Sequence, residues 1–281
     1  MKMTQLRKYV VFLSLAVFML LVNICASAQV SVLTQHNNNQ RTGANLNETT
    51  LNTSNVNGNQ FGLLFKLAVD DQVWASPLYV AALSIGGVTH NVVYVATSNN
   101  TVFAFDADRG GTALWSRNFN NGGRPTDHTE VGTGGFCNPY VDMVGHIGIV
   151  GTPVIDSSTN TMYFVARTVE GGGTVQRLHA IDITTGNDRA QVVIQANGFD
   201  PVVHNQRPAL TLSQGVVYIA WSSYCDFGGY HGFVMGYDAS TLQQVHVFND
   251  TPGGSQGGIW QAGQGASVDS NGDLYWETGN G

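Results

Sequence analysis

The stretch "TMYFVARTVEGGGTVQRLHAIDITTGN", from Thr161 to Asn187, decides the fold of this 281-residue chain. It opens with an apolar run around Tyr163, passes through a glycine-rich turn and continues in a second run that ends in a turn at Asp182. Short apolar runs bounded by Gly, Asp, Asn and Thr are typical of antiparallel strands joined by tight turns. In the final turn Asp182 can accept backbone N–H bonds and Gly186 can adopt φ > 0, so we expect Asp182 to be structural rather than catalytic.

The same pattern recurs along the chain. Each unit has a proline before a short apolar strand, a tyrosine in a second strand and an aspartate at the end of a third. The landmarks are Pro77, Pro153 and Pro208; Tyr94, Tyr163, Tyr218 and Tyr275; and Asp106, Asp182 and Asp238. From the second unit to the third they shift by 55 residues for Pro, 55 for Tyr and 56 for Asp. Three landmarks that move together predict a repeated four-stranded antiparallel module.

Repeats of about 40–50 residues built in this way are typical of β-propellers, in which each blade packs against its neighbours. The sequence therefore predicts an all-β propeller of four-stranded antiparallel blades, and an all-β sandwich is the alternative. The run around Tyr275 is a fourth copy of the second strand, so about three and a half blades are present. Because a propeller needs a closed ring, we expect an incomplete propeller: a fragment, or a chain that associates to cover its open ends.

Composition and motifs argue against several classes of function. Charged residues make up 11% of the chain, against roughly 25% in an average soluble domain. The net charge is −7 with only 12 Lys and Arg, which argues against a nucleic-acid partner, because phosphate neutralisation needs clustered basic residues. No G-x-S-x-G nucleophile elbow is present. The histidines share no zinc-ligand spacing; those considered are His128, His146, His179, His204 and His231.

The N-terminus resembles a targeting segment. Basic residues at its start precede an apolar run from Tyr9 to Ile24 and the small residues 26–28, which predicts a signal peptide over 1–28. A lipoprotein anchor at Cys25 is the less favoured interpretation, because Ile24 is large for the residue before such a cysteine. We expect a secreted or periplasmic protein with no membrane span after leader removal.

Three further segments carry open alternatives. The polar, Asn-rich arm 29–60 is either an ordered wrap that completes a blade or a mobile arm, and 61–281 is the predicted partial propeller. The long segment 118–148 either caps one face or is a solvated excursion. Cys137 and Cys225 either pair, as an oxidising compartment allows, or remain separate half-buried thiols.

The Asp turns resemble a known repeat. The segments "AFDADRGGTALW" (104–115), "AIDITTGNDRA" (180–190) and "GYDASTLQQVH" (236–246) are similar to the Ala-x-Asp-x-x-Thr-Gly-x-x-x-Trp docking repeat of pyrroloquinoline-quinone (PQQ) type propellers. The first has one extra residue before Trp115, the second ends in Ala190, and the third has Leu242 for Gly and His246 for Trp. The resemblance covers roughly residues 60–281, and the family includes quinoprotein dehydrogenases as well as propellers without a cofactor.

For the dehydrogenases, the resemblance implies PQQ at the centre with calcium beside it, held by an acidic residue, an Asn and a further Asp. Asp226 in "SSYCDFGG" matches the acidic position, where the family usually has Glu, and Asn280 in Thr278-Gly279-Asn280 matches the Asn. Trp260 is the nearest candidate for the stacking tryptophan, whose family position falls at Gly263. The family's vicinal Cys pair is absent, and its further Asp would lie in later blades.

Three functions remain open. The leading hypothesis is a non-catalytic propeller that binds a ligand or protein partner through its loops. The second is a PQQ- and calcium-dependent dehydrogenase, with Asp226 and Asn280 as metal ligands and little activity expected from this chain alone. The third is a carbohydrate-binding propeller, which predicts Trp74, Trp221 and Trp260 exposed on one face. Fold alone does not choose between them.

Overall fold

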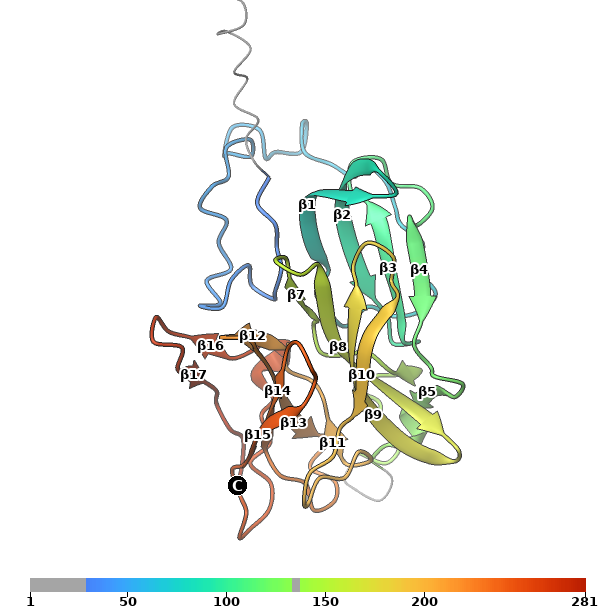
Figure 1. The fold of residues 1–281 in the computed structure, drawn as a ribbon, viewed down its shortest axis with the longest axis vertical. Helices are drawn as coiled ribbons and strands as arrows, with labels where there is room; N and C mark the ends of the chain where they lie inside the picture. Colours follow the sequence, from blue (N-terminus) through green and yellow to red (C-terminus); the bar gives the residue numbers. More distant parts are fainter. Residues whose placement is uncertain (1–28, 133–136) are drawn as a thin grey trace, which may run out of the picture.

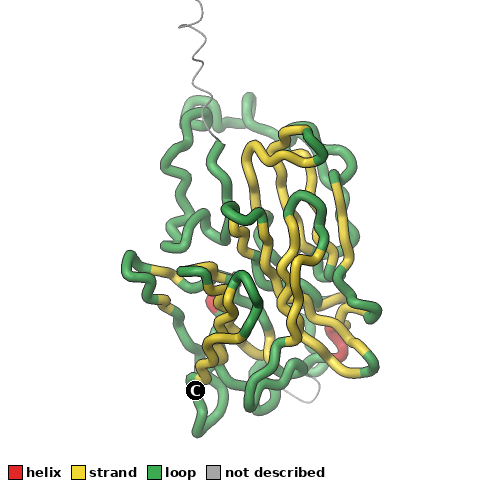
Figure 2. The backbone as a smooth tube through the Cα atoms, viewed as in Figure 1, coloured by secondary structure: helices red, strands yellow, loops and turns green. Residues whose placement is uncertain are grey.

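The computed structural model describes residues 29–132 and 137–281, which form β-sheets with two single-turn 3₁₀ helices (Figure 2). The predicted signal peptide and Cys25 lie outside the described residues. Sheets of four, six and five strands, each with four repeat strands, and a two-stranded fourth sheet stand side by side along an arc (Figure 1). Within the described residues no helix is long and apolar enough to cross a membrane.

The first sheet, blade 1, has the order β1-β2-β3-β4 and is antiparallel throughout. Its strands are β1 (Leu78–Ile85), β2 (Val88–Ala96), β3 (Thr101–Asp106) and β4 (Trp115–Asn118). The strand β3 ends at the first repeated aspartate, Asp106, as the sequence predicts. The extended segment before β1 places Phe65 against Gly110, where an added Cβ would lie 2.8 Å from the Phe65 ring.

Blade 2 contains the stretch that decides the fold. Its four repeat strands are β7 (Val154–Asp156), β8 (Thr161–Glu170), β9 (Gly173–Asp182) and β10 (Asp188–Val193). Two further strands, β5 (Arg124–Asp127) and β6 (His146–Ile147), extend the sheet beyond the end of β8. These two strands arise from the long segment 118–148, in which no strand was expected.

Blade 3 repeats the pattern with β12 (Thr211–Ser213), β13 (Val216–Ser223), β14 (Phe233–Asp238) and β15 (Gln244–Asn249). The short β11 (His204–Asn205) pairs with the end of β13. The chain then forms a two-stranded fourth sheet, blade 4, with β16 (Ser267–Val268) and β17 (Leu274–Tyr275). On β15 the side chains of Val245, Val247 and Phe248 are exposed by 47, 49 and 59%, so this outer strand has no further sheet over it.

The register of the second and third strands is the same in all three blades. Tyr94 lies opposite Ala104, Tyr163 opposite Ala180, and Tyr218 opposite Gly236. In every case the small residue stands two positions before the repeated aspartate. A small residue there leaves room for the tyrosine ring, which explains why the two landmarks move together in the sequence.

Two of the repeated tyrosines join successive blades. The Tyr94 hydroxyl donates to the Ile183 carbonyl in blade 2 at 2.8 Å, and the Tyr163 hydroxyl donates to the Ala239 carbonyl in blade 3 at 2.8 Å. Each acceptor directly follows the repeated aspartate of the next blade. Trp115 donates to the same Ile183 carbonyl at 3.0 Å. These bonds cross apolar layers, one between blades 1 and 2 and one between blades 2 and 3, which bury Phe164 and Trp221 completely.

The repeated aspartates hold turns, as predicted. Asp182 Oδ1 accepts from the Thr184 N–H at 2.7 Å, and the Gly186 N–H closes the turn onto the Asp182 carbonyl at 2.8 Å. Gly186 has φ +73°, and a Cβ there would lie 2.7 Å from Trp115. The glycine is therefore required both by its backbone conformation and by the docked indole. The hydrogen bonds to the carboxylate also lower the pKa of Asp182, despite the opposing effect of its partial burial.

The N-terminal arm is ordered along the first strands of the sheets (Figure 1). Its hydrogen bonds join Val32 to Tyr79 of β1, Leu33 to Ile155 of β7, and Asn39 to Leu212 of β12 and Val268 of β16. The buried Arg41 donates to Thr211 Oγ1 at 2.6 Å and to the Ala266 carbonyl at 2.8 Å. Residues 32–41 of the arm therefore contact four sheets, and the choice between a wrap that completes a blade and a mobile arm stays a prediction for 29–60 as a whole.

The segment 118–148 caps the loop face. Beyond its two strands it buries Val131, Tyr140 and Met143 in a small apolar cluster with Tyr224. A disulfide joins Cys137 in this cap to Cys225 after β13, with Cα atoms 6.0 Å apart and a sequence separation of 88 positions. Pairing is thus the observed alternative for the two cysteines, and capping is the observed alternative for the segment.

Candidate functional site

The candidate site lies on the loops that follow the second strands of blades 3 and 4. The strand β13 ends at Ser223, and the chain then turns sharply at Cys225 and Asp226, whose φ values are +53° and +52°. Non-glycine residues are uncommon at such angles, and each costs of order 1–3 kcal/mol. The disulfide at Cys225 anchors this strained turn to the cap and so fixes where the Asp226 carboxylate points.

The structure brings the two predicted metal ligands together. Asn280 Nδ2 donates to Asp226 Oδ2 at 3.3 Å, although 54 residues separate them in sequence. The other carboxylate oxygen, Oδ1, accepts from the Tyr230 hydroxyl at 2.5 Å. Burial and the bond to Asp226 raise the pKa of Tyr230, so this hydroxyl remains a donor at neutral pH. Asp226 is therefore held at one oxygen by Tyr230 and faces Asn280 with the other.

Backbone pairing positions Asn280 beside blade 3. The Gly257 N–H donates to the Asn280 carbonyl at 2.6 Å, and the Gly279 N–H donates to the Gly258 carbonyl at 2.8 Å. Residues 279–280 therefore run alongside residues 257–258. Asp250 lies behind this pairing and accepts from the Gly232 N–H at 3.0 Å, and its burial raises its pKa.

Trp260 lies next to the pair but in a different role from the expected one. The Cδ1–Nε1 edge of its indole faces Gly258 and Gly279, where an added Cβ would lie 3.1 Å away in each case. Gly263, the family position for a stacking tryptophan, has φ +90° and no atom within 4 Å of an added Cβ. The described residues thus place an indole beside Asn280 but offer no ring at the position where the family stacks the quinone.

Two buried side chains, Arg167 and His204, contact residues that adjoin the site. Arg167 donates to the Tyr224 hydroxyl at 3.0 Å, and its guanidinium lies 4.9 Å from the centre of the Tyr224 ring. His204 is fully buried; its Nδ1 lies 2.7 Å from the Asp200 carbonyl and its Nε2 accepts from the His231 N–H at 3.1 Å. Burial lowers the pKa of His204 to about 4. The ring is therefore neutral at pH 7.

The side chains at the candidate site could offer a metal ion oxygen ligands only. Among residues 29–132 and 137–281 no three His, Cys, Asp or Glu side chains gather in a way that could hold a metal ion. Any cation at Asp226 would have to take amide or backbone oxygens for its remaining ligands, which suits a hard cation such as Ca²⁺.

The tryptophans do not form the exposed platform that carbohydrate binding predicts. Trp221 is fully buried between blades and donates to Gln176 Oε1 at 2.8 Å. Trp74 packs against the cap cluster with Arg207 over its ring at 5.8 Å. These rings cannot stack on a sugar as a set, so the carbohydrate hypothesis loses its basis.

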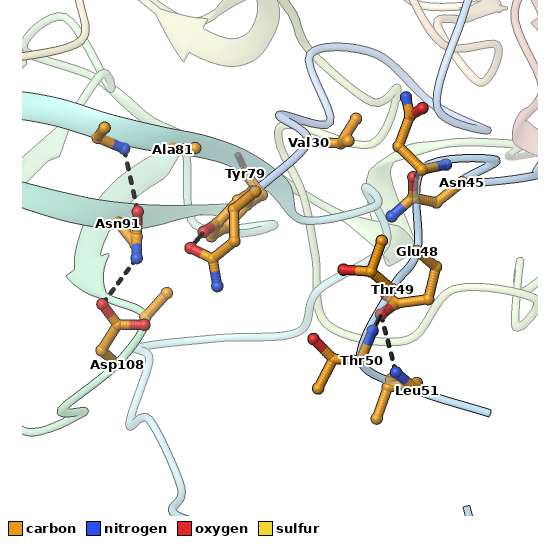
Figure 3. Close-up of a pocket in the computed structure, with 14 residues that line it drawn as sticks. Val30, Asn45, Glu48, Thr49, Thr50, Leu51, Tyr79, Ala81, Asn91 and Asp108 are labelled. Carbon is orange, nitrogen blue, oxygen red and sulfur yellow. Dashed lines mark hydrogen bonds between the residues drawn. The ribbon is translucent and has the colours of Figure 1, made fainter. Parts of the chain in front are cut away.

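A cavity lies elsewhere, between the arm and β1 (Figure 3). Its volume is about 720 Å³, and none of the predicted site residues line it. Its polar side chains bond to neighbouring protein groups: Glu48 accepts from the N–H groups of Thr50 and Leu51, and Asn91 donates to Asp108 at 2.8 Å. We therefore assign these side chains a structural role. The candidate site is placed at Asp226 because of the polar groups that meet there, and not because of the size of a cavity.

Comparison with known proteins identifies the fold. A quinohemoprotein alcohol dehydrogenase, ADHIIG from Pseudomonas putida HK5, superposes with a TM-score of 0.64 and 21% identity over 92% of this chain and 36% of that one. The quinohemoprotein alcohol dehydrogenase from Comamonas testosteroni gives 0.63 and 20% over 92% of this chain and 37% of that one. This chain is a partial propeller of the quinoprotein alcohol dehydrogenase fold. No family model and no curated protein matches the sequence.

The partial propeller spans little more than a third of these chains, and identities near 20% establish the fold alone. The predicted resemblance and fold class are confirmed, and the sandwich alternative is excluded. The roles of Asp226, Asn280 and Trp260 remain predictions. Motif reasoning missed two residues at the site, Tyr230 and Gln256, because neither belongs to the repeat and only the folded loops bring them to Asp226.

Proposed function

We propose that this chain is a ligand-binding propeller module whose loop face binds a hard divalent cation at Asp226 and Asn280. A single observation carries the proposal: residues 54 positions apart in sequence place a carboxylate oxygen and a side-chain amide nitrogen 3.3 Å apart. Ca²⁺ binds oxygen donors, so on binding the Asn280 amide would turn its oxygen, in place of its nitrogen, toward the ion beside Asp226. The Tyr230 bond and the neighbouring disulfide support it, because they fix Asp226 before any cation arrives.

The proposal includes export from the cytoplasm and a small-molecule or protein ligand that docks on the same loops. The Cys137–Cys225 disulfide supports export, because structural disulfides persist in oxidising compartments. The net charge of −7 supports a partner other than nucleic acid.

Titration of the folded chain with Tb³⁺, read by luminescence sensitised from nearby Tyr and Trp side chains and competed with Ca²⁺, tests the proposal. We expect saturable binding that Asp226→Asn weakens at least tenfold. Asp273→Asn is the matched control, because Asp273 is exposed in the turn between β16 and β17. Equal binding by wild type and Asp226→Asn would refute the proposal.

A PQQ-dependent dehydrogenase is the second candidate, and the meeting of Asp226 and Asn280 within this fold favours it. A quinone would supply the redox chemistry, with the cation polarising it. The described residues fit the cation better than the quinone, because Gly263 offers no stacking ring and Trp260 presents an indole edge to two glycines. Quenching of tryptophan fluorescence by PQQ, with and without Ca²⁺, tests this candidate. Calcium-dependent quenching would favour the enzyme, and absence of quenching would leave the binding module.

A further inference from the structure

A third oxygen donor, Gln256, reaches the Asp226–Asn280 pair. Asn280 Nδ2 lies 3.3 Å from Asp226 Oδ2 and 3.5 Å from Gln256 Oε1. One amide nitrogen therefore occupies the space between two oxygens that come from different loops. An amide N–H group and a cation bind the same oxygen lone pairs, so Asp226 Oδ2 and Gln256 Oε1 both already face a group that carries partial positive charge.

The backbone of Gln256 is fixed from several directions. Its N–H donates to the Tyr230 carbonyl at 2.7 Å, and its carbonyl accepts from the Gly232 N–H at 3.0 Å and the Thr251 hydroxyl at 3.0 Å. It has φ +71°, so a non-glycine residue stands in the left-handed region. Strain of this kind persists only where surrounding contacts impose it, and it is concentrated at functional sites.

We propose that Gln256 supplies the third protein oxygen of the cation site. The inference rests on the cation binding proposed above. On binding, the Asn280 side-chain amide rotates by half a turn, which places its oxygen where Nδ2 now stands. Asp226, Gln256 and Asn280 then present three oxygens to one point, while the Tyr230 hydroxyl retains the other carboxylate oxygen.

The separations select the size of the ion. Asn280 Nδ2 lies 3.3 Å from Asp226 Oδ2 and 3.5 Å from Gln256 Oε1, and after the proposed rotation the Asn280 oxygen takes these separations. Two oxygens so separated, each about 2.4 Å from Ca²⁺, subtend roughly 90° at the ion, an angle common in its coordination sphere. For Mg²⁺, with oxygens at about 2.05 Å, the same separations require roughly 105–120°, away from the octahedral angle that Mg²⁺ demands. The geometry therefore favours a calcium-sized ion. With one carboxylate and two neutral amides, we expect a dissociation constant on the order of 0.1–1 mM, as in extracellular calcium modules.

Two substitutions at Gln256 test its role as a ligand, because they should change Ca²⁺ affinity in opposite directions. Gln256→Gly removes the amide at a backbone angle that glycine prefers, so the variant should fold, and we expect Ca²⁺ binding to weaken about five- to tenfold. Gln256→Glu adds a charge at the same position, and we expect binding to tighten about tenfold. Gln243→Ala, in an exposed turn of the same blade, is the control and should bind like wild type.

Calorimetric titration with CaCl₂ and MgCl₂, with thermal melting in EDTA to verify folding, provides the readout. The proposal is supported if both Gln256 variants shift Ca²⁺ affinity in the expected directions and wild type prefers Ca²⁺ to Mg²⁺. If Asp226→Asn loses binding while Gln256→Gly and Gln256→Glu both bind like wild type, the role of Gln256 is refuted and the cation site stands. If wild type binds no Ca²⁺ at millimolar concentration, both proposals fail.

Discussion

Leu242 occupies the glycine position of the third Asp turn, and replacing it with glycine separates two opposing effects. Leu242 has φ +56°, which costs a non-glycine residue about 1–2 kcal/mol. Its side chain, however, is only 3% exposed and packs in the layer between blades 2 and 3. Removing a buried leucine side chain costs about 2–5 kcal/mol. Because the lost packing outweighs the relieved strain, we expect Leu242→Gly to lower the free energy of unfolding by about 1–3 kcal/mol, although it restores the repeat.

Urea denaturation followed by tryptophan fluorescence measures this change, with Leu242→Ala as the matched variant. The alanine variant loses the same packing but keeps the strained angle, so it should be less stable than the glycine variant by about 1 kcal/mol. An unchanged m-value would show that both variants unfold to the same extent as wild type. A glycine variant at least as stable as wild type would refute the reasoning, because it would mean that the leucine contributes less by packing than it costs in strain.

Three further predictions concern the joints of the fold. Tyr163→Phe should destabilise the chain by about 1 kcal/mol by urea denaturation, because it loses an interblade hydrogen bond, while Tyr218→Phe, which has no such bond in the described residues, should cost little. Reducing the Cys137–Cys225 disulfide opens a loop whose ends are 88 positions apart, and it should lower the free energy of unfolding by about 3–5 kcal/mol. Denaturation with and without dithiothreitol measures this change, and an unchanged free energy of unfolding would contradict a structural role. His204, with its pKa lowered to about 4, should make the free energy of unfolding fall as pH drops from 6.5 to 4, because the unfolded state binds the proton first. The fall should be up to about 3 kcal/mol, and a His204→Gln variant should lose that part of the slope.

The repeat could be predicted from the sequence because its landmarks are local consequences of strand geometry. Asp106, Asp182 and Asp238 all end third strands, and each repeated tyrosine faces a small residue two positions before the aspartate. An aspartate that closes a turn and a tyrosine ring that needs a small residue opposite it both restrict the sequence within a few positions. Such local restrictions can be recognised in the sequence. The partner carbonyls of Tyr94 and Tyr163 could not be predicted, because they depend on how one sheet packs on the next.

The segment 118–148 shows the limit of prediction from sequence patterns. Its strands β5 and β6 are short and polar, so no periodicity distinguishes them from a loop. They are fixed by pairing with the end of β8 and by the disulfide from Cys137 to Cys225, both of which are tertiary constraints. The arm 29–60 behaves in the same way, since Arg41 is held by groups in blades 3 and 4 that sequence cannot bring to it.

At the candidate site, sequence and structure contribute different residues. Resemblance singled out Asp226 and Asn280, and the fold brings them together, while Tyr230 and Gln256 become visible only in three dimensions. The backbone supplies an independent signal. Asp226 and Gln256 both have positive φ, yet neither closes one of the repeated Asp turns. Tight hairpins could have used glycine or asparagine at such angles without loss of stability. Because a carboxylate and an amide stand there instead, their oxygens rather than their backbone conformation best explain why these residues occupy the loops.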